Sequence, residues 1–289
     1  MELKNQLNPR KVFSTIGLGL LMFLLSSEVA ASLIVKLLGS INEDLLTKPW
    51  FIWVLNIVAN YLIAFPIFIL ILKKLPDGKL RESKKLSVGG IIKVCIIAFG
   101  ASTLTNILLQ FILSHIGYQP KVEATEIMSA NSFIWNLLAA GIIGPIVEEI
   151  MFRKLVISKT RQYGDKVALF TSAILFGLFH GNLVQSIYTI PLGIVLGYAA
   201  LKTGTVKYSI IGHIFFNTIG AIIAALCVFG INENIIVILQ RSLTAIGIIL
   251  LLFNIKKIKL VKGEIQLEKG RTFSVTCLNI GMILFVIYS

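Results

Sequence analysis

Charged residues are scarce in this sequence. Asp, Glu, Lys and Arg together make up only 14% of its 289 residues, whereas about 25% is usual in soluble globular domains. Hydrophobic residues reach 56%, and the mean hydropathy is +0.87. The composition therefore excludes an ordinary soluble domain and a disordered chain, and it predicts a multi-pass protein of the cell membrane.

The sequence also lacks a cysteine pattern for disulfides or metal binding, and it lacks alternating apolar and polar residues. Cys95, Cys227 and Cys277 lie far apart in apolar runs, which excludes a disulfide framework and matches no metal-ligand spacing. The apolar runs are continuous and show no alternation of apolar and polar residues, so they predict helices. Because the sequence has no soluble domain, internal repeat or low-complexity tract, we expect residues 1–289 to form a single all-α membrane domain.

Nine apolar runs are candidate membrane spans. A helix needs about 20 apolar residues to cross the hydrocarbon core, and the sixth and ninth runs are short for this purpose. We therefore predict a polytopic bundle of eight or nine helices, with spans at about 13–37, 50–72, 88–114, 133–155, 167–183, 186–201, 208–230, 235–254 and 274–289.

Acidic residues are outnumbered, with 14 against 27 basic ones, which gives a net charge of +13. The basic residues gather in alternate connections between the apolar runs, beginning with the N-terminal arm. Such clusters mark cytoplasmic loops that face anionic lipid. We therefore expect a cytoplasmic N-terminus and a lipid bilayer, not nucleic acid, as the partner of these residues.

The most unusual stretch lies at the end of the fourth run and holds Glu148, Glu149 and Arg153. Ionisable residues inside a span are costly, and they indicate a functional site. Glu149 and Arg153 are four residues apart, so on a helix they can pair and lower the cost of burying both charges. Glu148 lies about 100° around the helix from Glu149 and is left to face another group.

Two later stretches carry polar residues at helical spacing. Phe176 and His180 are four residues apart, and so are His213 and Asn217. A carboxylate beside a histidine can take a proton from water, while a second histidine and a carboxamide can donate to a developing oxyanion. The residues therefore fit hydrolysis, and the alternative is a polar network that only holds the helices together.

Three motifs now stand in order: Glu-Glu-x-x-x-Arg at 148–153, Phe-x-x-x-His at 176–180 and His-x-x-x-Asn at 213–217. Together they resemble the motifs of the CAAX protease and bacteriocin-processing family, also called Abi. The resemblance covers a protease core of about residues 130–225. It implies an intramembrane endopeptidase that acts on a membrane-associated peptide or protein.

The resemblance also implies roles for the motif residues. Glu148 and His180 would activate the attacking water, and His213 and Asn217 would stabilise the oxyanion. The supporting residues would be Glu149, Arg153 and Phe176.

Metal dependence and biological role have alternatives. We favour a metal-free glutamate mechanism with no cofactor, because the sequence lacks His-Glu-x-x-His. Zinc is the alternative, with Glu148, His180 and His213 as ligands. The resemblance implies peptide processing or bacteriocin self-immunity as roles. The alternative function is a non-catalytic membrane immunity protein that binds its partner with the same fold.

Overall fold

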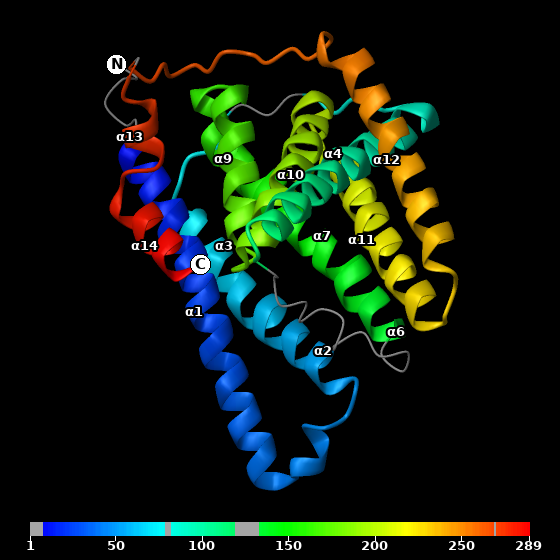
Figure 1. Ribbon diagram of the computed structural model, residues 1–289. Coiled ribbons are helices and arrows are strands. Elements are labelled where there is room, and N and C mark those ends of the chain that lie inside the picture. The colour runs from blue at the N-terminus through cyan, green and yellow to red at the C-terminus, as the bar shows by residue number, and fades with distance from the viewer. Residues whose placement is uncertain (1–7, 79–81, 119–132, 269) are drawn as a thin grey trace. The chain divides into compact units, whose positions relative to one another are not determined.

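The computed structural model describes residues 8–78, 82–118, 133–268 and 270–289. All regular structure in these ranges is helical, apart from an isolated antiparallel bridge between Gly164 and Lys262. The predicted all-α polytopic bundle is confirmed (Figure 1). The elements are α1 (Pro9–Ile41), η2 (Glu43–Leu45), α2 (Phe51–Asn56), η3 (Ile57–Ala64), α3 (Phe65–Leu72), α4 (Val88–His115), α6 (Phe133–Trp135), η5 (Asn136–Ile143), α7 (Gly144–Glu149), η6 (Ile150–Val156), α8 (Ile157–Thr160), η7 (Arg161–Tyr163), α9 (Asp165–Leu178), α10 (Leu183–Thr203), α11 (Lys207–Val228), α12 (Glu233–Ile255), α13 (Thr272–Thr276) and α14 (Ile280–Tyr288).

The predicted count of eight or nine spans is wrong for the described residues. Seven helical stretches there are long and apolar enough to cross a membrane. They are Pro9–Ile41, Phe51–Leu72, Val88–His115, Phe133–Tyr163, Leu183–Thr203, Lys207–Val228 and Glu233–Ile255. The fourth of these, Phe133–Tyr163, joins α6 to η7 in one run and is called the motif helix below.

The two predicted spans that fail are 167–183 and 274–289. The first corresponds to α9, whose 14 residues rise about 21 Å, short of a hydrocarbon core of about 30 Å. The chain leaves the helix there because Gly181 adopts a φ of +64° and Asn182 starts α10 as its N-cap. The second is divided into α13 and α14, because Asn279 caps α14. Since the N-terminus-inside orientation assumed that residues 167–183 cross, that orientation stays a prediction.

Prolines within two spans widen the helix before them. Proline has no N–H, and its ring collides with the carbonyl four residues earlier. Before Pro66 and before Pro145 the helix has eight residues of π-helical, i→i+5 hydrogen bonding, η3 and η5. In both cases the N–H of the residue before the proline donates to the carbonyl five residues earlier. The helix therefore accommodates each of these prolines with wide helical turns.

The chain divides into two compact units, each described here by itself. One comprises residues 1–79, 155–171 and 261–289, and the other comprises residues 80–154 and 172–260. The single domain expected from the sequence stays a prediction.

In the first unit, α14 packs along α1 (Figure 1). Gly17 of α1 meets Gly281 of α14 so closely that a Cβ at either position would collide with backbone atoms of the other helix. The Gly281 N–H also donates to Ser14 Oγ at 3.0 Å, and Arg10 Nη2 donates to Leu278 O at 2.7 Å. Only glycine permits this approach of the two backbones.

The same unit contains a docked segment, residues 261–265. Asp165 N–H donates to Val261 O at 2.9 Å, Val261 N–H donates to Asp165 Oδ2 at 2.9 Å, and Ile265 N–H donates to Gln162 O at 3.0 Å. These bonds hold the segment against the turn that follows the motif helix.

A buried lysine fixes another segment of this unit. Lys159 Nζ lies 2.8 Å from Asp77 Oδ1 and donates to Leu75 O at 2.9 Å. Partial burial of Asp77 acts against its ionisation, but hydrogen bonds from Lys159 and Ser158 outweigh burial and hold the pKa of Asp77 below its ordinary value.

In the second unit, α4 packs against α10, α11 and α12, and α11 also packs against η5 and α7. Small residues allow close contacts between these helices: a Cβ at Gly177 of α9 would press on Ile190 of α10, and one at Gly212 of α11 would press on Leu196 of α10. Gly220, by contrast, faces open space. These contacts hold the helices of the second and third motifs against a common neighbour, α10.

Candidate active site

The first motif lies on α7 and the following turns of the motif helix. Arg153 Nη1 lies 3.2 Å from Glu149 Oε1, and both side chains are fully buried. The ion pair predicted from their spacing is therefore present. The side chain of Glu148, one residue earlier, is 22% exposed. The two adjacent carboxylates thus differ in accessibility, and only Glu148 can reach a bound molecule.

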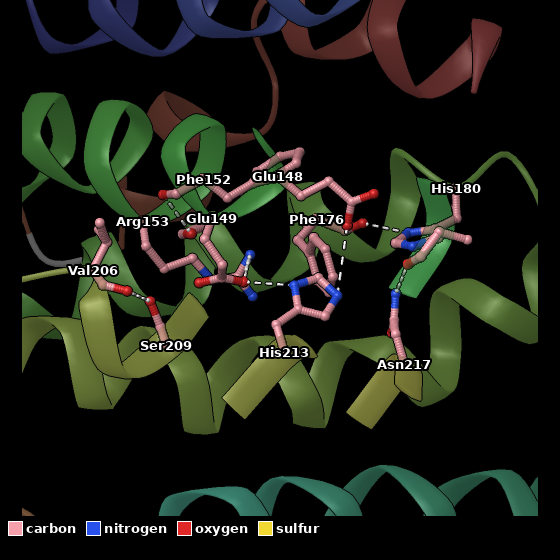
Figure 2. Close-up of polar contacts among 12 residues, drawn as sticks. Glu148, Glu149, Phe152, Arg153, Phe176, His180, Val206, Ser209, His213 and Asn217 are labelled. Atoms are coloured by element: carbon pink, nitrogen blue, oxygen red, sulfur yellow. Dashed lines mark hydrogen bonds and ion pairs between the residues drawn. The ribbon is translucent and has the colours of Figure 1, made fainter. Parts of the chain in front are cut away.

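His213 of α11 connects the two glutamates. Its Nδ1 lies 2.9 Å from Glu149 Oε1 and its Nε2 lies 3.6 Å from Glu148 Oε2 (Figure 2). Because an ionised carboxylate only accepts hydrogen bonds, Nδ1 carries a proton and donates it to Glu149. The imidazole of His213 therefore lies between the side chains of Glu148 and Glu149.

Phe176 of α9 is the aromatic centre of the site and is fully buried. The Arg153 guanidinium lies 4.2 Å from the centre of its ring, and the rings of His180 and His213 meet it edge-on at 5.0 and 5.4 Å. Phe152 packs against it at 5.4 Å. One ring therefore supports the arginine by a cation–π contact and fixes the planes of both imidazoles.

His180 lies two residues beyond the end of α9, in the turn closed by Gly181. Its Nδ1 lies 2.8 Å from Phe176 O, so Nδ1 carries the proton and Nε2 is left with a lone pair. It interacts electrostatically with Glu148. The imidazole is therefore held as a proton acceptor on the side of the site that carries the accessible carboxylate.

Asn217 lies one turn after His213 on α11. Its Nδ2 donates to the backbone carbonyl of Ala140, in η5, at 2.8 Å. The Asn217 side chain is thus hydrogen-bonded to the main chain of the motif helix. Its partner in this bond is neither Glu148 nor Glu149. All seven residues singled out in the sequence belong to one unit, and their catalytic roles stay predictions.

The alternative zinc site does not fit this arrangement. Within the ranges that the structure describes, no three His, Cys, Asp or Glu side chains converge as metal ligands. Glu148, His180 and His213 are therefore not gathered as a three-ligand set in the described residues.

Sequence reasoning missed two contributors. Ser209 is fully buried beside the Glu149 carboxylate, with its hydroxyl donating to Val206 O at 2.9 Å. It lies four residues before His213, and this spacing was the available signal. Pro145 lies in the fourth span, but its effect on Ala140 depends on the hydrogen-bond register of η5. Ser172 has no catalytic partner in the described structure, because its hydroxyl donates to Phe152 O.

Comparison with known proteins agrees with this geometry. Residues 130–219 match the model of the family described as "Type II CAAX prenyl endopeptidase Rce1-like". The chain contains an Rce1-like domain. Residues 130–132 lie outside the described structure, and the remainder of the Rce1-like domain includes all three motifs.

A curated relative points the same way. The chain is 22% identical over 165 residues to "Putative membrane peptidase YdiL" of Bacillus subtilis (strain 168), covering 56% of this chain and 68% of the relative. No solved structure matches. The protein is thus a multi-pass membrane protein with an Rce1-like peptidase-family domain.

Proposed function

We propose that the protein is an intramembrane endopeptidase that hydrolyses a peptide bond of a membrane-associated peptide or protein. The observation that carries the proposal is the pairing of an accessible carboxylate, Glu148, with the His213 imidazole, which buried Glu149 and Arg153 hold in place. The Rce1-like domain supports the same reaction class.

In the proposed first step, Glu148 and His180 bind a water molecule between them. His180 contributes the lone pair of Nε2, because its Nδ1–H is donated to Phe176 O. Glu148 takes the water proton while the water oxygen attacks the scissile carbonyl carbon. General-base assistance of this kind contributes about 10²–10⁴-fold to the rate.

The attack places a negative charge on the carbonyl oxygen. His213, as an imidazolium, donates from Nε2, and Asn217 donates from its carboxamide. Glu149 holds the imidazolium in orientation through Nδ1. The proton held by Glu148 then passes to the amide nitrogen, the carbon–nitrogen bond breaks, and the two products are a carboxylic acid and an amine.

The proposed substrate class is narrower than peptides in general. The site lies on helices of a membrane bundle, so a substrate must be a membrane-embedded or membrane-bound chain. Peptide processing and bacteriocin self-immunity are the roles we infer for such an activity.

The first experiment compares the termini of membrane proteins and secreted peptides. The strains are parent, deletion, and deletion complemented with the intact gene, with Glu148→Gln, or with Glu268→Gln as an exposed control. We expect one or more new termini with the intact and Glu268→Gln chains and none with Glu148→Gln at matched membrane levels. If Glu148→Gln produces the same termini, or restores the deletion phenotype with no terminus changed, the catalytic proposal is wrong and a binding role replaces it.

A further inference from the structure

The hydrogen-bond register of η5 assigns no backbone donor to the Ala140 carbonyl, because the residue five positions later is Pro145. In η5 the Gly144 N–H donates to Ala139 O, in the i→i+5 register. The same register assigns Ala140 O to the nitrogen of Pro145, which carries no hydrogen. A backbone carbonyl of the helix that carries Glu148 and Glu149 is therefore left for a side chain.

Asn217 of α11 supplies the missing hydrogen-bond donor, because its Nδ2 lies 2.8 Å from Ala140 O. A carbonyl oxygen only accepts hydrogen bonds, so the NH₂ end of the carboxamide, and not its oxygen, must face Ala140. The NH₂ group has two N–H donors, and this contact uses one of them. The orientation of the second donor is thereby fixed, and it remains available to another acceptor.

We propose that Pro145 is a positioning residue for Asn217. By withholding an N–H, Pro145 preserves the Ala140 carbonyl as the acceptor that orients the Asn217 carboxamide and joins α11 to the motif helix. The structural part of the proposal is that Pro145 preserves the hydrogen bond between Asn217 and Ala140, and it does not depend on enzyme activity. The catalytic part is that the second N–H of Asn217 donates to the oxyanion, and it rests on the proposed function.

Alanine at position 145 tests the structural part, because it supplies an N–H that can reach Ala140 O in the existing register. We expect Asn217→Ala alone to lower the melting temperature by about 2–4 °C, since it leaves a carbonyl of a candidate membrane-spanning helix without a donor. In the Pro145→Ala background the same change should lower it by less than about 1 °C. Equal falls in both backgrounds would overturn the proposal.

The matched control is Pro66→Ala. Pro66 follows η3 as Pro145 follows η5, with the same local hydrogen-bond register, but it lies away from the site residues in sequence and in the other unit. The Asn217→Ala effect should be unchanged in this background. If Pro66→Ala suppresses it as strongly as Pro145→Ala does, the coupling is not specific and the inference fails.

A second variant keeps the proline and guards against a Pro145→Ala chain that does not fold. Asn217→Asp at pH 8 replaces the donor with an acceptor facing Ala140 O. It should lower the melting temperature by more than Asn217→Ala does, because two acceptors then oppose each other. A fall no larger than that of Asn217→Ala would contradict the need for a donor.

Kinetics test the catalytic part, with the substrate identified by its new terminus. We expect Pro145→Ala to lower kcat by about tenfold with KM within about twofold, less than the about 10²–10³-fold loss caused by removing an oxyanion donor. If Pro145→Ala leaves kcat unchanged while the melting temperatures are as expected, the catalytic part is wrong and the Asn217 hydrogen bond has only a structural role. If no chain shows turnover, the proposed function fails, while the melting temperatures still decide the hydrogen-bond proposal.

Discussion

Replacing Arg153 with methionine tests the buried ion pair most directly. The guanidinium is fully buried, lies 3.2 Å from Glu149 and stacks on Phe176. Methionine fills a similar volume without the charge, and it leaves the Glu149 carboxylate without its cation. Breaking one side of a buried pair costs about 3–5 kcal/mol. At roughly 2–4 °C per kcal/mol, the melting temperature should fall by about 6–20 °C.

A double variant separates the charge from the packing. Glu149→Gln combined with Arg153→Met removes both charges, and neutral replacement of a buried pair is often close to neutral in stability. We expect the double variant to have a melting temperature close to that of the parent and well above that of Arg153→Met, as measured by thermal unfolding in detergent. Activity should not return, because His213 has lost the carboxylate that holds its Nδ1–H.

The exposed pair of Arg271 and Glu268 provides the control. These side chains are 3.1 Å apart, each is 72% exposed, and such pairs contribute little to stability. Arg271→Met should therefore change the melting temperature by less than about 2 °C. The reasoning is refuted if Arg153→Met is as mild as Arg271→Met, or if the double variant is as unstable as the single one.

Three further predictions address the aromatic centre, pH and metal. Phe176→Leu should lower stability by about 1–3 kcal/mol and reduce kcat, because Arg153 and both imidazoles lose their ring contact; Phe170→Leu, at an exposed position of the same helix, should leave both nearly unchanged. Since the pKa of Asp77 is lowered in the folded chain, its contribution to stability is present above its unfolded pKa and is lost as pH falls through the folded one. The melting temperature should therefore fall more steeply between about pH 5 and pH 2 in the parent than in Asp77→Asn, and parallel curves would contradict this. Strong chelators should leave turnover intact while Glu148→Gln abolishes it, whereas loss on chelation with rescue by zinc would favour the metalloenzyme alternative.

Local spacing made part of the site predictable. Glu149 and Arg153 are four residues apart on one helix, and the cost of burying either charge alone makes their pairing the expected solution. The separation of Glu148 from this pair follows from the 100° step of the helix. Neither inference needed knowledge of how the helices pack.

Contacts between helices were not predictable in the same way. The bond from His213 to Glu149 depends on how closely α11 approaches the motif helix, which small residues permit but do not specify. The Asn217 contact was even harder to predict from the sequence, because its acceptor is a main-chain oxygen that is available only in the π-helical register. The end of α9 before His180 depends on the turn at Gly181 and on the cap at Asn182. Neither was predicted, because both residues fall within the hydrophobic run 167–183, which was interpreted as one continuous span.

The packing of α14 on α1 has a consequence for biosynthesis. The Gly281 N–H and the Ser14 hydroxyl are separated by 267 residues, so α1 is synthesised long before α14. Throughout that interval, the surface around Gly17 that later contacts Gly281 must face lipid or another helix. We therefore expect the first unit to assemble only after α14 has been synthesised, at a rate governed by this long-range docking.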